Sequence, residues 1–294
     1  MVPPWAPSFA PRTFEHKLGS RRAKPGSALG ALFLVPTSDH LAPFAGMIRI
    51  RFCGCDLSPD DGAPRYAEAS ITRVSRARYD GIAEWYDREF ATGELATAPR
   101  EATLRLLGDG PGALLDVGCG TGAHTAVLSE HGWSAIGVDI SEDQLRLARE
   151  RGLEVVQGDA TNLPFEDASF DAVVSMWTHT DVEDFPALVR EVARVLRPGR
   201  PFVYLGAHPC FVGPHSRFIS AEGVPELHPG YWRTERYDEG PAISPRGLRA
   251  KVGASHLPLG DFIQSFLATG FKLEQFEELK TREYPYVVAL RCRR

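Results

Sequence analysis

The feature that most restricts the fold of this chain is a regular alternation of short apolar segments with helix-like segments between residues 101 and 205. Such alternation is typical of a parallel sheet with helices on both faces. Because right-handed crossovers bring the carboxyl ends of parallel strands to one edge of the sheet, a ligand is expected at that edge. Strands are predicted over 113–117, 134–139, 153–157, 170–176 and 201–205, and helices over 101–107, from the glycines up to 130, over 141–151 and over 185–196.

The N-terminal region and one long internal segment depart from this alternation. Nine of the 23 prolines precede residue 65, so residues 1–70 are expected to form a poorly ordered extension, with Met47 as an alternative start. A single domain is expected over 71–294. Within it, residues 208–256 are too long for a plain connection and are predicted to be a lid or substrate insertion. A helix over 259–269 and strands over 271–276 and 284–290 are expected to complete the domain.

The composition argues against several kinds of partner. The formal net charge is −5, which disfavours nucleic acid. No apolar run approaches the ~20 residues that a membrane span needs, so no membrane partner is expected. An odd number of scattered cysteines argues against a disulfide framework, so a reducing, cytoplasmic location is expected. The five cysteines are scattered, and no His, Cys, Asp or Glu cluster has convincing ligand spacing, so no metal is expected. The expected partner is therefore a small-molecule substrate, and the expected oligomeric state is a monomer or homodimer.

A glycine-rich segment begins at the end of the first predicted strand. It reads Asp116-Val117-Gly118-Cys119-Gly120-Thr121-Gly122. Glycines there allow a sharp turn from strand to helix and a close approach of a ligand to the backbone. Dinucleotide-binding oxidoreductases use a similar turn, but with the pattern G-x-G-x-x-G. Here the pattern is G-x-G-x-G, and the carboxylate of Asp116 would repel a pyrophosphate, so an oxidoreductase is the weaker interpretation.

Two more acidic residues follow the next two predicted strands. Asp139 ends the second strand, where a carboxylate can accept hydrogen bonds from both ribose hydroxyls. Asp159 comes directly after the third strand, where it could accept from an adenine amino group. Any one of these acids alone is better explained as a helix cap or turn residue. Three in succession, in this order, favour a nucleoside-binding edge.

Together these segments resemble the class I S-adenosylmethionine (SAM)-dependent methyltransferases over roughly residues 75–292. The resemblance implies a Rossmann-like, doubly wound α/β fold whose seven-stranded sheet is mostly parallel with an antiparallel last strand. It implies SAM as the cofactor and says little about the acceptor. The matching segments are 114–122, Val138-Asp139-Ile140-Ser141, 158–165, Ser169-Phe170-Asp171 and Leu196-Arg197-Pro198-Gly199.

The resemblance also implies roles for individual residues. Asp139 would hold the ribose, Asp159 and Ala160 the adenine, and Asp116 the ammonium group of the cofactor. A segment from Tyr79 to Asp87 is similar to the family's helix that covers the cofactor, although Tyr79 and Tyr86 could equally pack in the core, since their spacing puts both on one helix face. The complete set of implied cofactor-binding residues is Tyr79, Tyr86, Asp116, Gly118, Gly120, Asp139, Ile140, Asp159, Ala160 and Met176.

The sequence indicates the catalytic residues less clearly than the cofactor-binding residues. Methyl transfer depends mainly on alignment of the acceptor, but a hydroxyl acceptor must also lose a proton, a task suited to histidine. His179, beyond the fourth strand, and His208 and His256, at the two ends of the insertion, are the candidate bases, although the position of His179 favours a structural role for that residue. Transfer to oxygen of a small molecule is the first hypothesis.

Other functions stay open. Transfer to nitrogen or carbon and an inactive SAM-binding protein are the alternatives. A protein or RNA methyltransferase is disfavoured, because no Asn-Pro-Pro-Tyr type sequence follows the fourth strand.

Overall fold

The structure is a computed structural model that describes residues 77–92, 96–218, 223–241, 243–244 and 247–294. The predictions for residues 1–70, including the alternative start at Met47, lie outside the described residues. Within the described part of the chain, no helix is long and apolar enough to cross a membrane.

A seven-stranded sheet forms the centre of the fold, in the order β3-β2-β1-β4-β5-β9-β8. The first five strands pair in parallel, and β9 pairs antiparallel with both of its neighbours. This confirms the predicted fold class with its antiparallel last strand. The strands are β1 (Ala113–Val117), β2 (Ser134–Asp139), β3 (Glu154–Gln157), β4 (Ala172–Met176), β5 (Pro201–Ala207), β8 (Lys272–Glu278) and β9 (Val287–Arg293).

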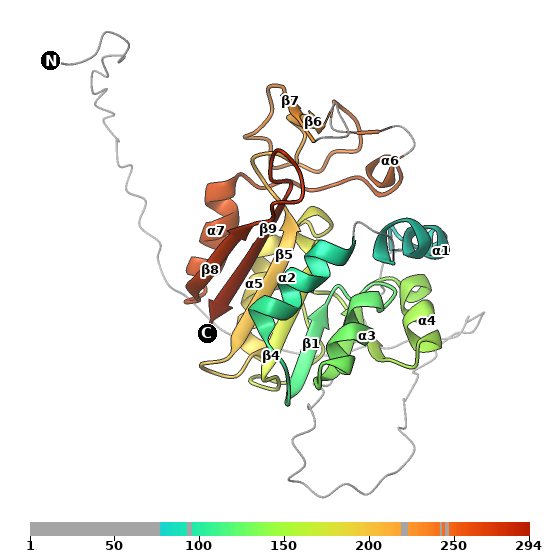
Figure 1. The fold of residues 1–294 in the computed structure, drawn as a ribbon, viewed down its shortest axis with the longest axis vertical. Helices are drawn as coiled ribbons and strands as arrows, with labels where there is room; N and C mark the ends of the chain where they lie inside the picture. Colours follow the sequence, from blue (N-terminus) through green and yellow to red (C-terminus); the bar gives the residue numbers. More distant parts are fainter. Residues whose placement is uncertain (1–76, 93–95, 219–222, 242, 245–246) are drawn as a thin grey trace, which may run out of the picture. The chain divides into compact units, whose positions relative to one another are not determined.

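Helices cover both faces of the sheet (Figure 1). Side chains of successive strand residues point to opposite faces, and the core divides accordingly. Leu115 of β1 packs in the cluster that holds α5 and α7, whereas Leu114 packs in the cluster that holds α2 and α3. The helical segments are α1 (Ala83–Tyr86), the π-helical turn η1 (Asp87–Ala91), α2 (Thr97–Leu107), α3 (Ala123–Glu130), α4 (Glu142–Glu150), the 3-10 turn η3 (Thr178–Thr180), α5 (Phe185–Val195), α6 (Leu248–Val252) and α7 (Leu259–Leu267).

Local sequence explains where these elements begin and end. The hydroxyl of Ser141 accepts a hydrogen bond from the amide of Gln144 at 3.3 Å and caps α4, while Asp184 caps α5 by accepting from Ala187 at 2.8 Å. Side-chain oxygens at these positions satisfy amides that the helix leaves free. The predicted bounds agree with the observed ones at β1 and β2 and differ by a few residues elsewhere.

The predicted insertion at 208–256 has some secondary structure of its own. Strands β6 (Ser216–Phe218) and β7 (Pro225–Leu227) form an antiparallel hairpin, and α6 precedes a return to the main body. The hairpin and α6 lie beyond the end of the sheet at which β5 finishes (Figure 1). The amide of Ser255 donates to the carbonyl of Thr180 at 2.7 Å, which joins the end of this segment to η3. A lid function for this segment stays a prediction.

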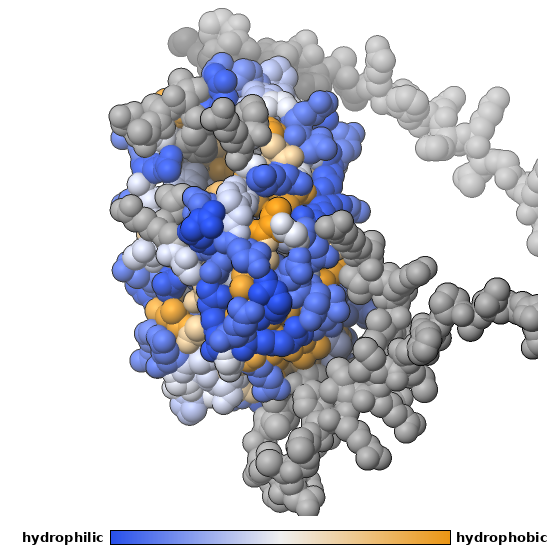
Figure 2. Space-filling view, turned by 90° about the vertical axis from the view of Figure 1, so that its right-hand side faces the viewer, coloured by the Kyte–Doolittle hydropathy of each residue, from blue (hydrophilic) through white to orange (hydrophobic). Residues whose placement is uncertain are grey.

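Hydrophobic residues on the face drawn in Figure 2 form separate patches among hydrophilic ones. A surface of this kind is ordinary for a folded domain, since much of any protein surface is apolar.

Two glycines with the same backbone conformation provide a test of packing at the start of α3. Gly122 and Gly152 both have a φ of +77°, but a Cβ on Gly122 would lie 2.9 Å from the Cβ of Ala148, whereas a Cβ on Gly152 would meet nothing within 4 Å. Gly152→Ala should therefore cost only the left-handed strain, about 1–2 kcal/mol. Gly122→Ala should cost about 1–3 kcal/mol more because of overpacking. Urea unfolding without cofactor measures both, and equal losses would contradict the packing argument.

Candidate functional site

A pocket of about 440 Å³ opens at the carboxyl ends of β1, β2 and β4. This is the edge at which the sequence predicted a ligand, and the volume lies within the ~300–1,000 Å³ typical of small-molecule sites. The lining residues are Ala77, Arg78, Tyr79, Tyr86, Gly118, Gly120, Val138, Asp139, Ile140, Gln144, Gly158, Asp159, Ala160, Thr161, Met176, Trp177, Thr178, Asp181, Val182, Glu183 and Asp184.

The glycine-rich loop forms one wall of this pocket. The amide of Gly118 donates to the carbonyl of Val138 at 2.8 Å, which ties the loop to the end of β2. Gly118 has a φ of +74°, and a Cβ there would lie 2.4 Å from the Cγ2 of Thr178. A side chain at this position is therefore excluded both by the backbone and by the segment after β4.

Asp139 lies in the middle of the pocket, at the end of β2. Its two carboxylate oxygens accept one backbone amide each, from Ser141 and from Gly120, both at 2.9 Å. Burial raises the pKa of Asp139 above its ordinary value, and these hydrogen bonds oppose that effect. The carboxylate is thus fixed in orientation by the backbone and still lines the pocket.

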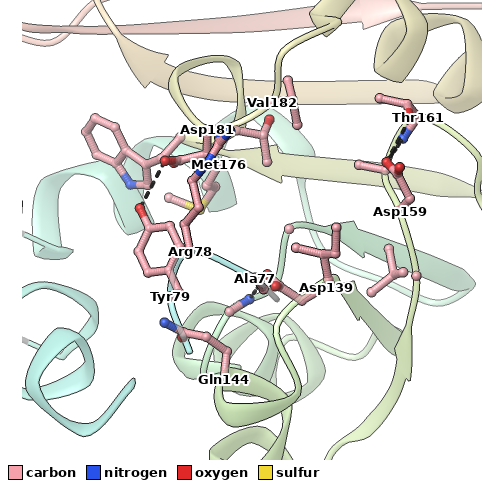
Figure 3. A pocket seen from close by; sticks show the side chains of 18 of the residues that line it. Ala77, Arg78, Tyr79, Asp139, Gln144, Asp159, Thr161, Met176, Asp181 and Val182 are labelled. Atoms are coloured by element: carbon pink, nitrogen blue, oxygen red, sulfur yellow. Dashed lines mark hydrogen bonds between the residues drawn. The ribbon is translucent and has the colours of Figure 1, made fainter. Parts of the chain in front are cut away.

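The other residues predicted for the nucleoside also line the pocket. Asp159 accepts from the amide and the hydroxyl of Thr161, at 2.8 and 2.7 Å. Figure 3 shows Asp159 and Thr161 at one end of the pocket and Tyr79 and Asp181 at the other, with Asp139 between them. Ile140, Ala160 and Met176 belong to the same lining.

Asp116 differs from the other predicted acids, because it is not one of the residues that line the pocket. It is only 2% exposed, and it accepts a hydrogen bond from the hydroxyl of Thr125 at 2.7 Å. Burial raises its pKa to about 6. The structure therefore places this carboxylate beneath the glycine-rich loop, against α3.

The segment around α1, which resembles the family's cofactor-covering helix, contributes residues to the lining of the pocket. The rings of Tyr79 and Tyr86 meet edge to face with centroids 5.2 Å apart, and both residues line the pocket. Both tyrosines thus line the pocket and pack against each other, and neither belongs to the two core clusters of the sheet. Asp80 accepts from the hydroxyl of Ser141 at 2.7 Å and Asp87 pairs with Arg151 at 2.7 Å, which holds the segment onto the main body.

None of the three candidate histidine bases is among the residues that line the pocket. His179 is 2% exposed, lies among aromatic rings that include Phe262, and contacts the hydroxyl of Tyr204 through Nδ1 at 2.5 Å. Burial, aided by the charges of Arg249 and His256, lowers the pKa of His179 to about 3. This ring is neutral at pH 7 and packed in the core.

His208 and His256 are also buried and bonded elsewhere. His208 lies 2.8 Å from Glu278 through Nε2 and accepts from the amide of Cys210 through Nδ1 at 3.1 Å. His256 donates through Nε2 to the carbonyl of Tyr231 at 2.8 Å, and burial lowers its pKa to about 4. Their positions support a role in holding the insertion together.

Several pocket residues were missed by the sequence analysis. Asp181 follows His179 in the same segment after β4, so position alone could have indicated it. Arg249 could not have been found in this way. It lies on α6, 68 residues further along the chain, and still pairs with Asp181 at 2.6 Å. The other lining residues that were not among the predicted site residues are Ala77, Arg78, Val138, Gln144, Gly158, Thr161, Trp177, Thr178 and the run 182–184.

Comparison with known proteins is consistent with this geometry. Residues 115–203 match the family described as "Methyltransferase domain". The demethylmenaquinone methyltransferase of Tropheryma whipplei is 35% identical over 165 residues, which cover 53% of this chain and 69% of that protein. The fatty-acid O-methyltransferase of Mycolicibacterium smegmatis is 42% identical over 104 residues, 33% of this chain and 38% of that protein. The chain spans about half, 54%, of the length of other curated demethylmenaquinone methyltransferases that it matches.

A solved structure agrees over a longer stretch. The SAM-dependent methyltransferase from Mesorhizobium loti is 26% identical with a TM-score of 0.55, covering 73% of this chain and 99% of that one. The sheet order, the pocket at the strand ends and these similarities lead to one assignment. The chain belongs to the class I SAM-dependent methyltransferases.

Proposed function

We propose that this protein transfers the methyl group of SAM to an oxygen atom of a small molecule. The observation that carries the proposal is the carboxylate of Asp139, held between two backbone amides in the centre of a pocket at the strand ends. Such a group suits a ribose with two neighbouring hydroxyls. The relatives named above, which act on demethylmenaquinone and on fatty acids, support a small-molecule acceptor.

The pocket fits the cofactor that the family uses. Asp139 would hold the ribose, Asp159, Ala160 and Ile140 the adenine, and Gly118 and Gly120 the methionine part, with Tyr79, Tyr86 and Met176 closing the walls. Asp116, which is buried under the loop, would act through the loop and not by direct contact. When bound, SAM supplies an already activated methyl group. The residues of this chain bind it, orient it and exclude water.

The acceptor is proposed to enter at the end of the pocket formed by Tyr79 and Asp181, opposite the nucleoside end (Figure 3). The 208–256 insertion lies next to this end, since Arg249 of α6 pairs with Asp181. We also propose a cytoplasmic monomer or homodimer without nucleic-acid or membrane partners.

Transfer to nitrogen or carbon, and a SAM-binding protein without activity, are the alternatives. Incubation with methyl-labelled SAM and a metabolite extract separates them. Label that appears in a low-molecular-weight product supports the enzyme, and mass spectrometry of that product identifies the acceptor atom. SAM binding without any labelled product would support the inactive alternative.

Loss of the central carboxylate should reduce cofactor affinity. Asp139→Ala removes a charged acceptor for two hydroxyl groups, so we expect SAM binding at least tenfold weaker, about 1.4 kcal/mol or more. Isothermal titration calorimetry measures the change. Glu142→Gln is the control, because Glu142 is on the adjoining α4, pairs with Arg149 at 2.6 Å and is not a lining residue. An unchanged affinity in Asp139→Ala would contradict the proposed cofactor site.

The histidine bases can be tested with the acceptor that the labelling experiment identifies. A general base at His179, His208 or His256 would lower kcat ~10²-fold when changed to alanine, with SAM affinity nearly unchanged. Because these rings are buried and bonded away from the lining, we expect each variant to keep kcat within about tenfold of the original. Thermal unfolding of each variant controls for loss of structure. A 10²-fold fall in kcat at an unchanged melting temperature would restore the histidine hypothesis.

Removal of metal ions should have no effect on turnover. Among the described residues, no group of three or more His, Cys, Asp or Glu side chains could hold a metal ion. We therefore expect full activity after dialysis against EDTA. Loss of activity that Mg²⁺ restores would contradict this expectation.

A further inference from the structure

Asp181 is a pocket carboxylate for which the cofactor has no evident use. It lies at the end of the pocket opposite Asp159, beyond Asp139 (Figure 3). If Asp139 holds the ribose and Asp159 the adenine, the methionine part and its methyl group extend toward Asp181. The argument therefore rests on the proposed function, and specifically on the direction in which SAM lies.

The two carboxylate oxygens of Asp181 differ in their hydrogen-bond partners. Oδ1 accepts from Arg249 at 2.6 Å and from the hydroxyl of Tyr79 at 3.1 Å. Oδ2 has one contact among the described residues, with the hydroxyl of Thr180 at 3.5 Å, which is too long for a good O–H···O hydrogen bond. The side chain is one-quarter exposed and lines the pocket. One oxygen is thus held in place by the protein, and the other keeps lone pairs for a ligand.

The charges around Asp181 favour a hydrogen-bond donor over an anion. The two guanidinium groups nearest the site are already paired, Arg249 with Asp181 and Arg78 with Glu183 at 2.5 Å. Arg236, further back, donates to the carbonyl of Val252 and does not line the pocket. A carboxylate acceptor would have to compete with Asp181 or Glu183 for the guanidinium groups of Arg249 and Arg78. An acceptor with an O–H or N–H group needs only Oδ2 of Asp181.

We propose that Asp181 is a catalytic residue that contacts the methyl acceptor, and that the acceptor presents an O–H or N–H group to Oδ2 and is not a carboxylate. Tyr79 and Arg249 are positioning residues, which hold Oδ1 and so aim Oδ2. As the methyl group leaves, its bond to sulfur breaks, the electron pair stays on sulfur, and a lone pair of the acceptor forms the new bond to carbon. The acceptor proton passes to Oδ2 and from there to solvent.

The position of Asp181 can be tested without knowing the acceptor. Sinefungin is a SAM analogue with an amine in place of the methyl sulfonium, and S-adenosylhomocysteine has no charge there. Asp181→Asn should weaken binding of sinefungin at least about tenfold, as for loss of a charged hydrogen bond. Binding of S-adenosylhomocysteine to the same variant should change less than about threefold. Equal losses for the two ligands would overturn the placement of Asp181 at the methyl group.

Two further variants support this test. Glu183→Gln removes the same charge from the same pocket, but from a side chain that is 71% exposed, so the ratio of the two affinities should stay unchanged. If Asp181→Asn fails to fold and binds neither ligand, Arg249→Met serves instead. It removes the neighbouring positive charge and keeps Asp181, so sinefungin should gain relative to S-adenosylhomocysteine. An unchanged ratio in that variant would overturn the proposal.

The acceptor class has a separate chemical test. Methyl esters of carboxylic acids release methanol in mild alkali, whereas methyl ethers and N-methyl groups do not. The labelled product from methyl-labelled SAM and a metabolite extract should therefore keep its label after alkali treatment. Volatile labelled methanol would overturn the assignment of an O–H or N–H acceptor. If no product is labelled at all, the proposed function fails, while the sinefungin experiment still decides where Asp181 lies.

Discussion

The contact on which the rest of the site depends is the pair of backbone amides, from Gly120 and Ser141, that converge on the carboxylate of Asp139. These amides belong to two different turns, one after β1 and one after β2, and the carboxylate joins them. The turn after β1 can approach this closely because Gly118 and Gly120 adopt positive φ angles. The sheet supplies the second condition, since β1 and β2 are parallel neighbours and both turns occur at the same edge.

Prediction from sequence succeeded where a local pattern determines the structure. The strands and the acids that follow them could be found because strand alternation and chain order place them at one edge. Asp139 and Asp159 lie in the predicted pocket for this reason, whereas Tyr79 was indicated only by the family resemblance of its segment.

Prediction was weaker where a backbone turn or a contact between distant segments determines the position of a side chain. Asp116 and Gly118 are two residues apart, yet Asp116 is buried under the loop and Gly118 lines the pocket, because β1 ends at Val117 and the backbone turns at Gly118 with a φ of +74°. His179 and Asp181 are equally close in sequence, and the η3 turn directs the imidazole into the aromatic core and the carboxylate into the pocket. Arg249, the partner of Asp181, lies in a segment without helix or strand periodicity. A contact of this kind cannot be predicted from the spacing of residues in the sequence.

The junction of Tyr79, Asp181 and Arg249 joins three segments that are distant along the chain: the covering segment near α1, the turn after β4, and α6 of the insertion. A shared carboxylate makes their positions interdependent. A displacement of the covering segment that breaks the hydrogen bond from Tyr79 leaves Arg249 as the remaining described partner of Oδ1. Such a change also affects the ion pair that attaches the insertion to the turn after β4. If a ligand at the proposed nucleoside end displaces the covering segment, its binding would be coupled to binding at the proposed acceptor end, and by reciprocity each ligand would change the affinity for the other by the same factor.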